Sequence, residues 1–179
     1  MDAEQHDLQG QIDLATQRLT STVIRLSAED VLQPSLLPGW SRGHVLTHLA
    51  RSADAMRNLL TWAWTGAQTP AYASAQARDA DIALGAGRSV AELLADLVDS
   101  GVAFRSWALA LPDRAWRVPV RVLDYPEFPA AQLLIRRLVE VELHHTDLGA
   151  GYEPGGWPAS FAAMELPEPM LSQRASRSS

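Results

Sequence analysis

Glu140 and His144 are four residues apart in the segment RRLVEVELHHTDLGAGY, and His48 lies far upstream in GWSRGHVLTHLARSADAM. Residues four apart lie on the same face of a helix, so this carboxylate and this imidazole can converge on one point. A third ligand from another helix would give a divalent metal three protein ligands and leave one position open for water, a thiolate or a substrate oxygen. The spacing therefore predicts two of the three ligands of a metal site whose open position would suit catalysis.

The choice among the histidines depends on the helical wheel of each segment. His48 falls at the edge of the apolar arc of its segment, whereas His44 lies further round, in the first turn, where it can serve as a cap. We therefore favour His48 over His44 as a ligand. In the later segment, His145 is near the middle of the apolar stripe and His144 is on its flank, so periodicity alone leaves both open.

Two alternatives compete with this site. Glu142 and His145 have the Glu-x-x-His spacing of di-iron bundles, but such sites need a second copy and several more carboxylates, and none is visible in the sequence. In the other alternative no metal binds, and Arg137, one turn earlier, compensates Glu140. A buried and unpaired carboxylate would be too costly without one of these partners.

These candidates need helices to position them, and the apolar periodicity predicts four. The predicted helices cover residues 7–26, 42–64, 90–111 and 130–148, with Ser41 and Ser89 as N-caps of the second and third and glycines after the fourth. The third helix is expected to bury a single stripe, made of Val90, Leu93, Leu94, Leu97, Val98, Val102 and Phe104.

The predicted fold class is all-α, an up-down four-helix bundle with long connections and minor β content. Residues 65–87 are expected to be a long connection with at most a short helix, and the prolines of 112–129 limit that segment to short edge strands. We expect residues 1–160 to form the bundle and residues 161–179 to form a short, flexible C-terminal tail, with a short helix around 159–164.

Composition excludes several classes of function. The net charge of -6 and the pI near 5.3 argue against nucleic acid as a partner, and no apolar run is long enough for a membrane span. The N-terminus is polar and acidic, unlike a secretory signal, so we expect the cytoplasm as the location. The sequence contains neither cysteine nor lysine, so any thiol chemistry must use a small molecule. The sequence does not indicate an oligomeric state.

Three segments, in order and with their spacing, resemble one known family. LPGWSRGHVLTHLARSADAMRNLL, ARDADIALGAGRS and RRLVEVELHHTDLGAGY closely resemble the metal-binding N-terminal domain of the mycothiol-dependent maleylpyruvate isomerases, within the DinB-like four-helix superfamily. The resemblance covers roughly residues 8 to 160. It implies that His48, Glu140 and His144 are the metal ligands, and that the metal is zinc with an open coordination position.

The same resemblance implies roles around the metal. It implies that Arg137, His145, Asp147 and Arg51 are candidates for contacts with the metal ligands or with the substrate. A dianionic substrate would need arginines, for which the nearest options by motif are Arg51, Arg78, Arg88 and Arg137.

The implied function is a metal-dependent and mycothiol-dependent enzyme. A metal-bound thiol loses its proton more easily and could add to a conjugated cis double bond, which would then rotate before the thiolate leaves. The partners would be a small thiol and a maleylpyruvate-like unsaturated acid, or another electrophile in a thiol transferase. Full-length isomerases carry a smaller second domain beyond the bundle, which these 179 residues do not include. The alternative function is therefore a non-catalytic bundle that binds a metal or another ligand.

Overall fold

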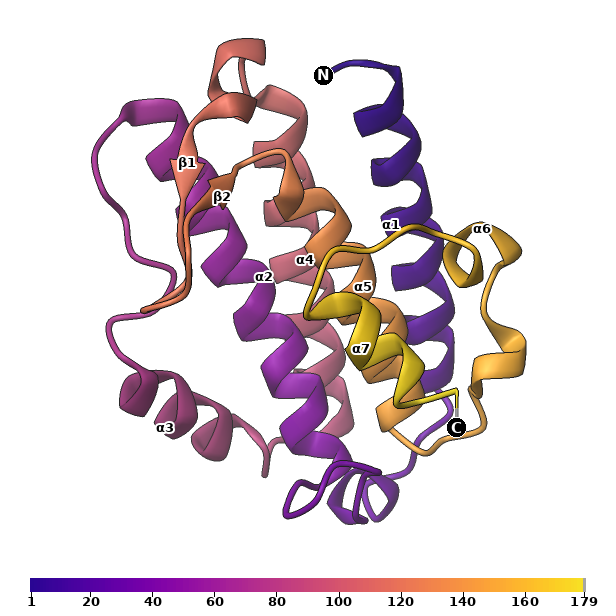
Figure 1. Cartoon of the computed structure of the whole chain (residues 1–179). Coiled ribbons are helices and arrows are strands. Elements are labelled where there is room, and N and C mark those ends of the chain that lie inside the picture. Colours follow the sequence, from indigo (N-terminus) through magenta and orange to yellow (C-terminus); the bar gives the residue numbers. More distant parts are fainter. Residues whose placement is uncertain (179) are drawn as a thin grey trace.

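The computed structural model describes residues 1–178, and four long helices dominate it (Figure 1). They are α1 (Ala3–Val23), α2 (Arg42–Thr65), α4 (Val90–Ala110) and α5 (Gln132–Asp147). α2 and α1 each pack against both α4 and α5, which closes the four helices around a common core. The prediction of an all-α four-helix bundle is confirmed.

The directions of the helices follow from one long crossover. The chain returns along the bundle between α2 and α4, so these two helices run in the same direction, while α5 runs opposite to α4 (Figure 1). This return path places α3 (Ala75–Gly85) beside α2. The sequence predicted at most a short helix in this connection. α3 has 11 residues, begins at the N-cap Ser74 and buries Ile82, the kind of single anchor that helical periodicity does not reveal.

Local capping explains where the long helices begin. The Ser41 side chain accepts a hydrogen bond from the His44 backbone, and the His44 ring bonds back to the Ser41 backbone, so the two residues form a reciprocal cap of α2. Ser89 and Glu92 form the same arrangement at α4. α2 ends at Gly66, whose φ of 75° is the left-handed conformation that favours glycine.

The predicted stripe of α4 is wrong at two positions. Leu93, Leu97 and Phe104 are buried as expected, but Val98 is 39% exposed and Val102 is 58% exposed. Both valines line an open groove of about 280 Å³ between α1 and α4. These two apolar side chains therefore lie on the solvent side of α4 and not in the core.

Short elements fill the rest of the chain. Strands β1 (Pro119–Val120) and β2 (Phe128–Pro129) pair antiparallel, which confirms the expected minor β content at proline-limited edges. The 3₁₀ helices are Asp30–Leu32, Asp113–Arg117 and Pro154–Gly156. Within residues 1–178, none of the helices combines the length and hydrophobicity that crossing a membrane requires.

The C-terminal segment differs from the flexible tail that the sequence predicts. After α6 (Ala159–Ala162), residues 170–175 form α7 (Met170–Ala175), which packs against α5 (Figure 1). Met170 and Leu166 are buried in the main core, and this apolar contact holds the segment in place. Ser179, the last residue of the predicted tail, lies outside the described residues.

Candidate metal centre

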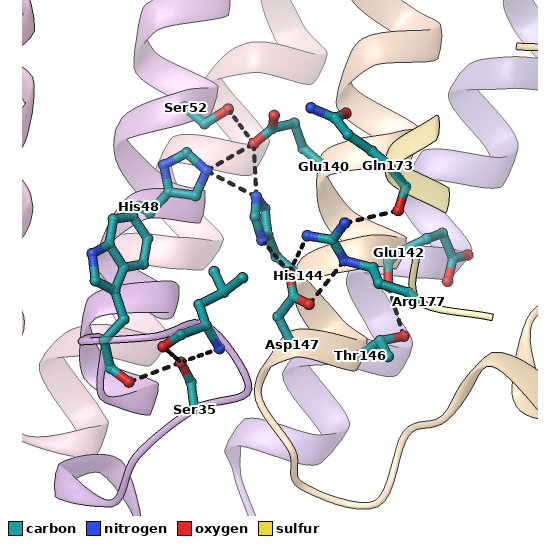
Figure 2. Close-up of polar contacts among 12 residues, drawn as sticks. Ser35, His48, Ser52, Glu140, Glu142, His144, Thr146, Asp147, Gln173 and Arg177 are labelled. Carbon is teal, nitrogen blue, oxygen red and sulfur yellow. Dashed lines mark hydrogen bonds and ion pairs between the residues drawn. The ribbon is translucent and has the colours of Figure 1, made fainter. Parts of the chain in front are cut away.

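Three of the predicted side chains, from two helices, converge on one point (Figure 2). His48 projects from α2, and Glu140 and His144 project from successive turns of α5. His48 Nε2 lies 2.9 Å from Glu140 Oε2 and 3.1 Å from His144 Nε2, and His144 Nε2 lies 3.5 Å from Glu140 Oε2. The structure thus brings together the residues that the sequence proposed as ligands.

The chemistry of this cluster suits a cation. Two imidazole nitrogens 3.1 Å apart cannot both point a proton at each other, so at least one offers a lone pair to the shared space. Two imidazole nitrogens and one carboxylate oxygen are a ligand set that zinc takes in catalytic sites, with a fourth position left open. The donor set fits a divalent metal.

Burial and neighbouring charges shift the pKa values of Glu140 and His48 toward the protonation states that bind a metal. Burial alone would raise the pKa of Glu140, but the neighbouring His48, His144 and Arg137 hold it far below its ordinary value, so Glu140 is a carboxylate. Burial lowers the pKa of His48 and favours its neutral form, which is the form that binds metals. His48 and His144 are largely buried, whereas the Glu140 side chain is 30% exposed and opens the cluster to solvent.

His144 is held from behind by a carboxylate. Its Nδ1 lies 2.8 Å from Asp147 Oδ2, so the ring directs Nε2 toward the cluster (Figure 2). Asp147 was predicted near the metal, and the structure places it in contact with a candidate ligand. Arg177 was not predicted, yet its guanidinium bonds Asp147 through Nε at 2.8 Å and Nη2 at 2.7 Å. No sequence signal links these two residues, which are 30 positions apart.

Side chains from three segments surround His48 and Glu140. The Trp40 ring lies 5.5 Å from the His48 ring in an edge-on orientation, and Ser52 Oγ donates to Glu140 Oε2 at 3.3 Å. Arg78, from α3, places Nη2 at 3.4 Å from His48 Nδ1. The unexpected helix α3 therefore contributes a cation to the edge of the cluster.

A hollow of about 310 Å³ lies between α2, α3 and the segment before α3, and one of its walls is Arg78, which contacts His48. Its walls include Arg51, Tyr72 and Arg78, so two of the predicted substrate arginines face it. Burial, reinforced by the charge of Glu140, raises the pKa of Tyr72 to about 12, so its hydroxyl remains a hydrogen-bond donor at neutral pH. Arg51 and Arg88 both pair with Asp96.

Two other candidates make no hydrogen bond to the three-residue cluster, although the charge of Arg137 helps to lower the pKa of Glu140. Arg137 is buried and donates to the Leu49 carbonyl at 2.8 Å, and burial lowers its pKa to about 10. His145 faces α1 instead, where its Nε2 lies 2.9 Å from Thr22 Oγ1 and its ring stacks on Tyr152. The structure therefore resolves the choice that periodicity left open, since His144 and not His145 meets His48.

The remaining alternatives from the sequence have other partners. His44 caps α2 and bonds Ser41. Glu142 is buried, pairs with Arg18 and accepts a hydrogen bond from the Tyr152 hydroxyl at 2.6 Å. The Glu142 and His145 pair is therefore committed to contacts between α5, α1 and the following loop.

Comparisons with known proteins agree with one another. The family model described as mycothiol maleylpyruvate isomerase N-terminal domain matches residues 12–149. The crystal structure of the mycothiol-dependent maleylpyruvate isomerase superposes with a TM-score of 0.83 at 29% identity, and so does that of its histidine-to-alanine mutant. The match covers 88% of this chain and 65% of that chain, so this chain spans less than two thirds of the isomerase. No curated protein matches the chain.

Proposed function

This chain belongs to the family of the mycothiol maleylpyruvate isomerase N-terminal domain, and from that premise we propose that it is a metal- and thiol-dependent enzyme. In this proposal His48, Glu140 and His144 hold one divalent ion, zinc by preference. The thiol is mycothiol, and the substrate is a maleylpyruvate-like unsaturated acid or a related electrophile. The observation that carries the proposal is the convergence of the three side chains on one centre.

At such a site the metal and the thiol would supply the reactive thiolate, and the residues of the chain would position them. With the metal bound, a coordinated thiol would exist as thiolate, whose addition to and expulsion from a conjugated cis double bond allows the rotation that isomerises it. The chain has no cysteine, so the thiol must be supplied by a small molecule.

Residues of the chain would orient the metal ligands and supply negative charge to the ion. Asp147 keeps the His144 Nδ1 proton on its side of the ring, which leaves Nε2 free for the cation. The Glu140 side chain is 30% exposed, so small reactants could reach an ion that these residues would hold. Ser52 fixes Glu140 Oε2 in the orientation that the cluster requires.

The hollow between α2 and α3 supports an acidic substrate. Arg78 lines it and contacts His48, and a guanidinium group can bind a carboxylate with two parallel hydrogen bonds. Arg51, on the same wall, is already paired with Asp54 and Asp96. Tyr72 adds a hydroxyl donor on the same wall.

The experiment measures ultraviolet absorbance of maleylpyruvate incubated with the purified zinc-loaded chain, with and without mycothiol. We expect isomerisation only when both zinc and mycothiol are present, and its loss in Glu140→Ala. His44→Ala is the matched control, because His44 lies on the same helix as His48 but outside the cluster. If the chain binds zinc but shows no thiol-dependent turnover of maleylpyruvate or of a panel of electrophiles, the proposal of an enzyme is wrong. That result would support a non-catalytic bundle that binds a metal.

A further inference from the structure

The C-terminal segment reaches a candidate metal ligand through a chain of charged contacts. Arg177 donates to both oxygens of Asp147, through Nε at 2.8 Å and Nη2 at 2.7 Å. The second of these oxygens faces His144 Nδ1, also at 2.8 Å. Figure 2 shows the resulting series of contacts from Arg177 through Asp147 to His144 and the cluster.

Asp147 needs a cationic partner where it lies. Its side chain is buried at the last residue of α5, where the helix dipole adds partial negative charge. A neutral imidazole offers it a hydrogen bond but no compensating charge. Arg177 supplies a full positive charge and a fork of two donors, the geometry that suits a carboxylate best.

The position of Arg177 is itself determined by packing. α7 is anchored by Met170, which is 3% exposed, and Arg174 Nη1 donates to the Phe161 carbonyl at 2.6 Å. Arg177 Nη1 donates to the Gln173 carbonyl at 2.8 Å, so the guanidinium has contacts on two sides. This is a held side chain rather than a solvated surface arginine.

We propose that Arg177 is a positioning residue of the metal site. It orients the Asp147 carboxylate, which fixes the proton on His144 Nδ1 and directs His144 Nε2 toward the space shared with His48 and Glu140. The segment 161–178 then contributes to the geometry of the metal site, because it holds Arg177 against Asp147. This inference rests on the metal binding of the proposed function, but not on its reaction.

Loss of an outer partner of a metal ligand typically weakens metal affinity about 10- to 100-fold. We expect Arg177→Met to raise the zinc dissociation constant of the full chain by about tenfold, measured by competition with a chromophoric chelator. Arg174→Met is the comparison variant for packing of the segment, because Arg174 contacts Phe161 and not Asp147. It should raise the zinc dissociation constant less than Arg177→Met does, and an equal or larger rise would contradict a specific role for Arg177. Arg177→Lys should restore part of the affinity, since it returns the charge without the fork.

A second readout does not require the metal. Nitrogen chemical shifts of the His144 ring in the metal-free chain should place the proton on Nδ1 in the wild type and a mixture of tautomers in Arg177→Met. Equal zinc affinity and equal ring tautomers in wild type and Arg177→Met would overturn the inference while leaving the proposed function intact. If Arg177→Met binds zinc more weakly and the wild type shows no thiol-dependent turnover, the inference about Arg177 is supported and the proposed reaction is not.

Discussion

Gly43 lies at the point where the start of α2 meets the end of α3, and replacing it with alanine should destabilise the fold. A Cβ at this position would lie 2.1 Å from the Ala86 carbonyl oxygen and 3.3 Å from the Val31 carbonyl oxygen. Both neighbours are backbone atoms, which cannot move aside as a flexible side chain can. The two segments would have to separate by about 1 Å to reach ordinary contact.

The expected magnitude combines two opposing effects. Overpacking against backbone costs about 3 kcal/mol, whereas alanine is up to about 1 kcal/mol better than glycine within a helix. The net loss for Gly43→Ala is therefore about 2 kcal/mol. For a chain of this size, such a loss lowers the midpoint of thermal unfolding by about 4 to 8 °C.

Urea unfolding monitored by circular dichroism provides the assay, with Gly10→Ala as the matched control. Gly10 is exposed in α1, and its Cβ would meet nothing within 4 Å. Gly10→Ala should therefore stabilise the chain by about 0.5 to 1 kcal/mol. The reasoning is refuted if Gly43→Ala is as stable as the wild type, or if both variants change stability in the same direction.

Three further predictions concern the bound metal, the titration of His145 and the hydrophobic core. Adding a chelator to the zinc-loaded chain should lower its unfolding midpoint, because free metal at about 1,000 times its dissociation constant stabilises the fold by about 4 kcal/mol, and His48→Ala should show no such difference. Burial, with nearby arginines, lowers the pKa of His145 to about 4, whereas the unfolded chain binds this proton near pH 6.5, so stability present above pH 6.5 is lost toward pH 4. His145→Asn should reduce this loss in urea titrations by up to about 3 kcal/mol, and an unchanged pH profile would contradict the assignment. Phe104→Ala should cost about 3 to 5 kcal/mol, because Phe104 is fully buried, whereas Leu109→Ala, at an exposed position, should cost much less, and equal losses would refute this view of the core.

Features encoded locally could be predicted from the sequence. Ser41 and Ser89 cap their helices through bonds to residues three positions later, so the helix starts need no information from elsewhere in the fold. The spacing of Glu140 and His144 places both on one face of a helix for the same reason. Their contact with His48 depends on how α2 and α5 pack. The helical wheel favoured His48 over His44 as a ligand, but only the family resemblance indicated which residues of the later helix His48 would meet.

Features that depend on tertiary packing were missed. The exposure of Val98 and Val102 depends on how much of α4 is covered by α1, which periodicity along one helix cannot reveal. The contact between Arg177 and Asp147 joins a short C-terminal helix to the end of α5. The tail is rich in proline and serine and was expected to be flexible, although three buried apolar side chains, Phe161, Leu166 and Met170, anchor it.

Metal analysis of the purified chain tests the central claim most directly. After zinc loading and removal of free metal, inductively coupled plasma mass spectrometry should find about one zinc per chain in the wild type and in His44→Ala, and almost none in Glu140→Ala. A folded Glu140→Ala protein that retains the zinc content of the wild type would contradict the claim that His48, Glu140 and His144 form the metal site.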